Sequence, residues 1–146
     1  MNEEKPPQLK KPVEGFAIST SFGRSGGNWK SGFHKGVDYP CPTGTIVKAA
    51  WDGVVSWAGD GKDGFGLYIK IEHNWKEVAF RTYYAHLSET KVAPGQEVKI
   101  GEPIGLSGHS GNVVASNPAS DGSHLHFEMR VGKESVCPKF YDQEDV

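Results

Sequence analysis

The 146-residue sequence has few cysteines, no long apolar run and almost no net charge. Cys41 and Cys137 are too few and too far apart for a zinc knuckle or a CxxC redox pair, so we expect ordinary thiols rather than a structural disulfide. No stretch approaches the roughly 20 apolar residues that a bilayer span requires, and residues 1–7 lack the pattern of a secretory signal. We therefore expect no membrane span and no export signal in this chain. A formal net charge of -2 argues against nucleic acid as a partner.

Glycine and proline are abundant instead, with 19 Gly and 9 Pro, against a usual combined share of about 12%. Turn residues separate short runs of β-branched and aromatic residues, a pattern typical of many short strands joined by tight turns. We predict an all-β, antiparallel fold, in which only residues 87–91 show any helical periodicity. The predicted strands cover 46–49, 53–57, 66–71, 79–84 and 125–130.

The chain is short enough to be one domain. Residues 1–14 are rich in Lys and Pro with few large apolar groups, and we predict a flexible tail there, with the folded domain over 15–146. Residues 42–49 and 94–101 both place a Pro/Gly turn before a short strand. This echo fits a sandwich of two similar halves, although chance similarity of turn chemistry explains it equally well.

Two histidine patterns point to chemistry. His34 and Asp38 are four residues apart, which places both side chains on one face of either a strand or a helix. His124 and His126 flank Leu125, and in a strand alternate residues share a face. The two imidazoles then face one cleft while Leu125 enters the core.

A His, an Asp and a second His make up the usual three protein ligands of a catalytic zinc ion. The fourth position stays open for a water molecule, whose pKa the metal lowers towards about 7. Of His124 and His126, one should bind the metal while the other transfers protons or stabilises charge. The alternative is that each pair arises by chance.

Three ordered blocks of sequence resemble the signature blocks of the lysostaphin-type (LytM-like, M23) zinc metallopeptidases. They run over 32–39, 83–88 and 124–128, and the similarity extends over roughly residues 21–130. The resemblance implies an antiparallel β-sheet sandwich of the duplicated hybrid motif type, with a groove-shaped active site. It implies an endopeptidase that hydrolyses peptide bonds in the stem or cross-bridge of bacterial peptidoglycan.

The resemblance also implies a role for five residues. His34, Asp38 and His126 match the ligands of one Zn²⁺ ion, and His86 and His124 match the two catalytic histidines. The first three agree with the metal set argued above, whereas His86 comes from the resemblance alone. Which of His86 and His124 is the general base stays open. We expect a monomer whose partner is the peptide part of peptidoglycan.

The remaining histidines are expected to lie outside the site. His73 closes a strand and is predicted to be a surface residue, and His109 lies in a turn that borders the cleft at most. Residues 112–123 are longer than the corresponding turn of many family members, and no Tyr precedes His34 where some members have one. The side chains of Trp29, Phe33 and Trp51 are candidates to line the groove, with ordinary packing favoured for Trp51.

Two other functions compete with catalysis. A catalytically silent LytM-like protein would bind the wall or activate an amidase, but such proteins are expected to have lost ligands that are all present here. A biotinyl or lipoyl carrier domain would need a Lys in an exposed hairpin, for which only Lys62 is a candidate, and no histidine cluster. We expect action at the bacterial cell wall, outside the cytoplasmic membrane. Since no signal peptide is found, that location is explained either by a phage-encoded or virion-associated enzyme or by a domain excised from a longer secreted protein, and we favour the phage-type enzyme.

Overall fold

The computed structural model describes residues 6–19, 21–23, 35–111 and 122–142, and within these ranges it contains strands and turns but no helix. Ten strands follow one another in the described part of the chain, and every named pair of them is antiparallel. The all-β prediction is confirmed. The strands are β1 (Val37–Pro40), β2 (Ile46–Lys48), β3 (Gly53–Asp60), β4 (Leu67–Trp75), β5 (Val78–Ala85), β6 (Leu87–Thr90), β7 (Glu97–Val98), β8 (Pro103–Ser107), β9 (His124–Val131) and β10 (Glu134–Val136).

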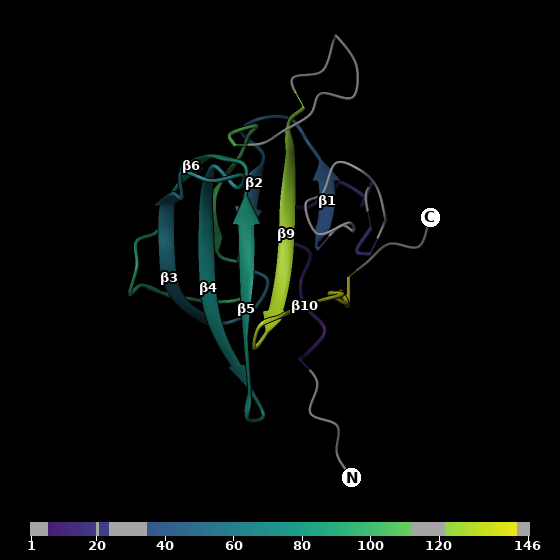
Figure 1. Ribbon diagram of the computed structural model, residues 1–146, viewed down its shortest axis with the longest axis vertical. Helices are drawn as coiled ribbons and strands as arrows, with labels where there is room; N and C mark the ends of the chain where they lie inside the picture. The colour runs from purple at the N-terminus through teal and green to yellow at the C-terminus, as the bar shows by residue number, and fades with distance from the viewer. Residues whose placement is uncertain (1–5, 20, 24–34, 112–121, 143–146) are drawn as a thin grey trace.

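The strands form two sheets. The larger has the order β1-β9-β5-β4-β3-β7, with β10 paired to the second half of β9, and its long strands lie side by side in Figure 1. The smaller has the order β2-β8-β6. Because buried residues of both sheets belong to one hydrophobic cluster, the two sheets pack as a sandwich.

Alternation along the large sheet separates a core face from an open face. In β4, Ile69 and Ile71 are buried while Glu72 is exposed, and in β9 Leu125 and Phe127 point into the same core. Side chains of the opposite parity, such as Tyr68, Arg81 and Arg130, lie only partly buried on the other face. We call this surface the open face, and its polar side chains remain accessible.

The five strands predicted from sequence are all present, as β2, β3, β4, β5 and β9, although β3 and β4 extend further than predicted. The hint of helix over 87–91 is wrong. Those residues form β6, because Leu87 and Thr90 pair with Ser107 and Gly105 of β8. Tertiary pairing overrides a weak local periodicity in so short a segment.

The N-terminal segment differs from the predicted tail. Leu9 and Val13 are buried, the Leu9 N–H donates to the Lys139 carbonyl, and the Lys48 N–H donates to the Pro12 carbonyl. Residues 9–13 therefore belong to the packed domain, since two apolar side chains and several backbone bonds offset the cost of ordering them. Composition alone hides this because Lys and Pro dominate the segment.

Cys41 is buried, Cys137 is exposed and both are free thiols, as predicted.

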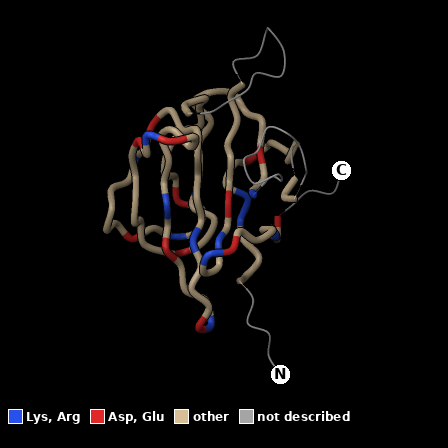
Figure 2. The backbone as a smooth tube through the Cα atoms, in the orientation of Figure 1, with Lys and Arg blue, Asp and Glu red and all other residues tan. Residues whose placement is uncertain are grey.

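Within the described ranges no helix is long and apolar enough to cross a membrane. Basic and acidic residues alternate over the described backbone in Figure 2 and form no block of one sign.

The prediction that His73 is a surface residue is wrong. His73 is buried on the core face, where its Nδ1–H donates to the Asp52 carbonyl at 2.8 Å and its Nε2 lies 2.7 Å from the Thr82 hydroxyl. The Thr82 hydroxyl is also hydrogen-bonded to the Tyr84 hydroxyl, which accepts from the Ala50 N–H. Burial lowers the pKa of His73 to about 4, so the ring is neutral at neutral pH.

The buried His73 predicts acid sensitivity. Its pKa rises from about 4 in the folded state to 6.5 on unfolding, so the unfolded state binds more protons below pH 6.5. Stability is therefore lost as the pH falls from 6.5 towards 4, by up to about 3 kcal/mol from this residue. Between pH 7 and pH 4, the free energy of unfolding of the His73→Gln variant should therefore fall by less than that of the parent, with the difference equal to the His73 contribution. Urea unfolding of both proteins at each pH measures it. Equal losses in the two proteins would show that His73 does not titrate as described.

Candidate active site

Strands β1 and β9 bring the first two site residues together. Their register places Asp38 opposite His126, and the Nδ1–H of His126 donates to Oδ1 of Asp38 at 2.7 Å. The flanking residues Val37, Tyr39, Leu125 and Phe127 point the other way, into the core. The prediction that Leu125 is buried while the neighbouring imidazoles share one side is confirmed.

A second carboxylate holds the far side of the His126 ring. The Nε2–H of His126 donates to Oε1 of Glu128 at 2.8 Å, and the Arg130 guanidinium donates to Oε2 of Glu128 through Nε and Nη2. Burial alone would lower the pKa of His126, but its hydrogen bonds to Asp38 and Glu128 outweigh burial and raise the pKa to about 9. The imidazole of His126 is thus hydrogen-bonded to a carboxylate on each side.

His124 lies two residues before His126 on the same face. Its Nδ1–H donates to the Gly122 carbonyl at 2.8 Å, and its Nε2 lies 3.8 Å from Oδ1 of Asp38. The backbone carbonyl thereby orients the ring and leaves its Nε2 on the side of Asp38.

His86 completes the cluster from β5. It follows Ala85, which pairs with His126, and its ring centroid is 4.8 Å from that of His124 and 5.9 Å from that of His126. Its Nδ1–H donates to the Ser110 carbonyl at 2.7 Å. Burial and the neighbouring His124 lower the pKa of His86 to about 4, so this ring is neutral at neutral pH with its Nε2 lone pair available.

The structure thus brings together four of the five predicted site residues, Asp38, His86, His124 and His126. His34 lies outside the described residues. Within the described part of the chain, no group of three or more His, Cys, Asp or Glu is arranged to hold a metal.

The donors that are described nevertheless fit zinc. Asp38 offers a carboxylate oxygen and His126 offers Nδ1, both ligand types that zinc accepts. The Glu128 carboxylate on the opposite nitrogen of His126 is the arrangement that orients a metal-binding imidazole and fixes its tautomer. Asp38 and His126 would therefore hold the ion, with His34 as the expected third ligand.

Sequence reasoning missed the aromatic residues beside the site. Phe65 lies 5.6 Å from the His126 ring, Tyr68 and Tyr83 stack at 6.4 Å, and Trp57 stacks on Tyr68 at 5.8 Å, all measured between ring centroids. The Arg130 guanidinium lies 4.3 Å above Tyr83. Alternation alone would have placed Trp57 on the core face with Val55, because only the register shift between these two residues of β3 turns Trp57 towards Tyr68.

Of the three aromatic residues that were candidates to line the groove, only Trp51 lies within the described residues. Trp51 packs edge-on against Trp75, with ring centroids 5.4 Å apart, which confirms ordinary packing. Trp29 and Phe33 fall outside the described residues, as does most of the long 112–123 segment.

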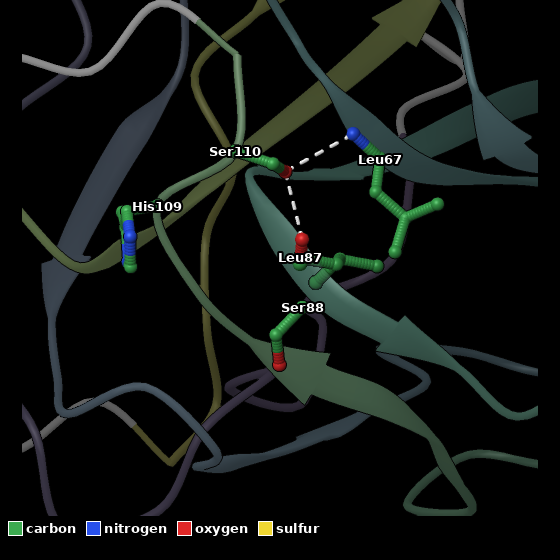
Figure 3. A pocket seen from close by; sticks show the side chains of 5 residues that line it. All are labelled: Leu67, Leu87, Ser88, His109 and Ser110. Atoms are coloured by element: carbon green, nitrogen blue, oxygen red, sulfur yellow. Dashed lines mark hydrogen bonds between the residues drawn. The ribbon is translucent and has the colours of Figure 1, made fainter.

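A hollow of about 290 Å³ lies beside His86, lined by Leu67, Leu87, Ser88, His109 and Ser110 (Figure 3). His109 stands on its rim, and its Nδ1 lies 3.3 Å from the Thr43 hydroxyl. His109 lines this hollow, and its place at the border of the cleft stays a prediction. Ser110, which no sequence pattern singled out, contacts His86 directly.

Comparison with known proteins identifies the family of the chain. The sequence profile of Peptidase family M23 matches residues 32–138. The chain is 40% identical over 105 residues to the DD-carboxypeptidase/endopeptidase Mpg of Neisseria meningitidis, covering 72% of this chain and 22% of Mpg. It is 35% identical over 130 residues to the murein hydrolase activator NlpD of Escherichia coli, covering 89% of this chain and 30% of NlpD.

Two solved structures have the same fold. The catalytic domain of lysostaphin from Staphylococcus simulans superimposes with a TM-score of 0.73 at 32% identity, covering 84% of this chain and 89% of that domain. A zinc-containing peptidase from Vibrio cholerae gives a TM-score of 0.74 at 31% identity, covering 94% of this chain and 41% of that protein. The chain thus matches a whole catalytic domain, but only about a fifth to a third of the curated relatives named above.

The Glu128–His126 hydrogen bond predicts an effect on metal affinity. Glu128→Gln removes the negative charge that holds the imidazole, and zinc affinity should fall about 10- to 100-fold, measured by competition with a chromogenic chelator. Glu72→Gln is the matched control, because Glu72 is exposed on the open face of β4 and bonds Ser56 instead. Unchanged affinity in Glu128→Gln, or an equal loss in both variants, would contradict this role.

Proposed function

Since this chain belongs to peptidase family M23, we propose that it is a zinc-dependent endopeptidase that hydrolyses peptide bonds in the stem or cross-bridge of bacterial peptidoglycan. The observation that carries the proposal is the convergence of Asp38, His86, His124 and His126 on the open face of one sheet. The relative Mpg is named a DD-carboxypeptidase/endopeptidase, and this name supports peptide-bond hydrolysis as the reaction.

Zinc bound at this site would polarise the scissile carbonyl and lower the pKa of a water molecule. Asp38 and His126 would hold the ion, together with His34 as the expected third ligand. Glu128 keeps the Nδ1 of His126 directed towards Asp38 by accepting the proton of Nε2. Burial alone would raise the pKa of Glu128, but the hydrogen bond and charge of His126, followed by those of Arg130, hold it below the ordinary range, so the carboxylate stays ionised.

His86 and His124 move the protons. In both rings Nδ1–H donates to a backbone carbonyl, so Nε2 is the nitrogen left to exchange a proton. Either Nε2 can accept the proton that the attacking water loses and pass it to the amine nitrogen of the broken peptide bond. The other ring then remains to orient the water or, when its Nε2 carries a proton, to stabilise the developing negative charge.

A second function is favoured by one comparison. NlpD, a murein hydrolase activator, aligns with 89% of this chain, so a domain of this kind can serve activation. The presence of Asp38, His86, His124 and His126 together supports catalysis rather than activation alone. We place the protein's action at the bacterial cell envelope; the relatives named above are bacterial and give no support to a phage origin.

The proposal predicts chelator-sensitive hydrolysis. The zinc-loaded chain should release peptide fragments from purified peptidoglycan of known chemistry, detected by mass spectrometry, and 1,10-phenanthroline should abolish release until zinc is restored. His86→Ala and His124→Ala should keep their zinc, because neither residue is a ligand, and should lose at least about 100-fold in rate.

His73→Gln serves as the matched histidine control, because it removes a ring from the core face of the same sheet. Once its folding is verified by circular dichroism, its rate should stay within about twofold of the parent. A zinc-loaded parent that releases no fragments but accelerates an added amidase would contradict the proposal and favour activation.

A further inference from the structure

His86 is held in a conformation that the backbone does not favour. Its φ is 63°, in the left-handed region that costs a non-glycine residue about 1–3 kcal/mol. Two contacts compensate: the His86 N–H donates to the Phe65 carbonyl at 2.9 Å, and the ring Nδ1–H donates to the Ser110 carbonyl. Both acceptors come from turns distant in sequence, so the ring orientation depends on where those turns lie.

The Ser110 side chain ties its turn to the strands around His86. Its hydroxyl donates to the carbonyl of Leu87, the residue that follows His86, at 2.7 Å, and accepts from the Leu67 N–H at 3.1 Å. Figure 3 shows both bonds converging on the one oxygen atom. The carbonyl and the hydroxyl of Ser110 thus hold two consecutive residues, His86 through its ring and Leu87 through its backbone.

The neighbouring glycines let the two turns touch. A Cβ atom at Gly111 would lie 2.5 Å from the Gly66 nitrogen, and one at Gly66 would lie 2.5 Å from the Ser110 carbonyl carbon. Such distances allow no side chain, so the turn carrying Ser110 packs backbone to backbone on the turn that ends in Phe65 and Gly66. The two acceptors of His86 therefore form one unit, joined through Ser110.

We propose that Ser110 is a positioning residue for His86. Its hydroxyl fixes the turn, its carbonyl holds the Nδ1–H tautomer, and the Nε2 of His86 is thereby kept available towards the other histidines. This inference rests on the proposed function, in which that Nε2 handles a proton or orients the water. Ser110 does not touch the substrate in this account and acts only through His86.

Loss of the Ser110 hydroxyl is expected to slow the chemical step of hydrolysis. Without the hydroxyl, the Leu67 N–H loses its acceptor and the turn can shift, so the carbonyl no longer holds the ring at one angle. Small displacements of a catalytic group cost up to about 100-fold in rate. Substrate binding elsewhere on the open face is unaffected.

The test compares Ser110→Ala with a matched serine. Ser107 is buried, whereas Ser110 is half-buried, and the Ser107 hydroxyl likewise donates to a carbonyl, that of Pro42 at 2.8 Å, and accepts from an N–H, that of Thr45 at 3.1 Å. It has no bond to His86 among the hydrogen bonds of the described residues. Ser107→Ala therefore reproduces the lost hydrogen bonds without the proposed positioning role.

With a soluble peptidoglycan peptide and zinc-loaded protein, Ser110→Ala should lose about 10- to 100-fold in kcat, with KM and zinc content within about twofold of the parent. Ser110→Thr retains the hydroxyl and should restore most of kcat. Ser107→Ala should lose comparable thermal stability but keep kcat within about twofold. Full kcat in Ser110→Ala, or an equal kcat loss in both alanine variants, would overturn the proposal.

A spectroscopic arm separates this inference from the proposed function. Long-range ¹H–¹⁵N spectra at neutral pH should show the Nδ1–H tautomer of His86 in the parent and Ser110→Thr, and a mixture of tautomers in Ser110→Ala. If the parent hydrolyses nothing, this readout still decides on Ser110. Should Ser110→Ala not fold, Ser110→Cys weakens the same two bonds at similar size and is judged by the same criteria. An unchanged tautomer in the folded variant would overturn the inference.

Discussion

The site depends on the two-residue alternation of β9 where it pairs with β1. Leu125, Phe127 and Met129 are fixed in the core, so His124, His126 and Glu128 must face the other way. A shift of one residue in the pairing would exchange the two sets and place imidazoles in the core. The burial of three large apolar side chains therefore specifies the position of the polar ones.

Pairing of β9 with β1 and β5 then brings the other site residues next to His126. The β1–β9 register places Asp38 across from His126, and the β5–β9 register ends at Ala85, so His86 emerges beside the same pair. Around this centre, backbone carbonyls of turns set the proton positions: Ser110 for His86 and Gly122 for His124. Sheet pairing thus places the rings, and the turns determine which ring nitrogen carries the proton.

Burial and charge act in opposite directions on neighbouring rings. His86 lies in an apolar setting beside another histidine, and its pKa falls to about 4, while His126 lies between two carboxylates, and its pKa rises to about 9. The first environment keeps a neutral ring with a free lone pair, and the second suits a cationic partner such as a metal ion. This divergence of environments agrees with separate roles for the two residues.

The shared face of His124 and His126 and the all-β fold could be predicted from sequence because strand alternation is a local property. The His124–Leu125–His126 pattern needs only a strand to place both rings on one face, and the turn-rich composition indicates strands. The role of Ser110 and the burial of His73 and Leu9 could not be predicted in this way. Each depends on contacts between segments far apart in the chain, such as Leu9 with Lys139 or His73 with Asp52.

The most direct test of the account is the location of the metal. Anomalous diffraction at the zinc edge, on crystals of the zinc-loaded chain, should give one strong peak within bonding distance of the Asp38 carboxylate and Nδ1 of His126. His34 should supply the third protein ligand, and the Nε2 atoms of His86 and His124 should face the ion without binding it. A peak bound to His86 or His124 in place of Asp38 and His126, or no peak between β1 and β9, would contradict the account.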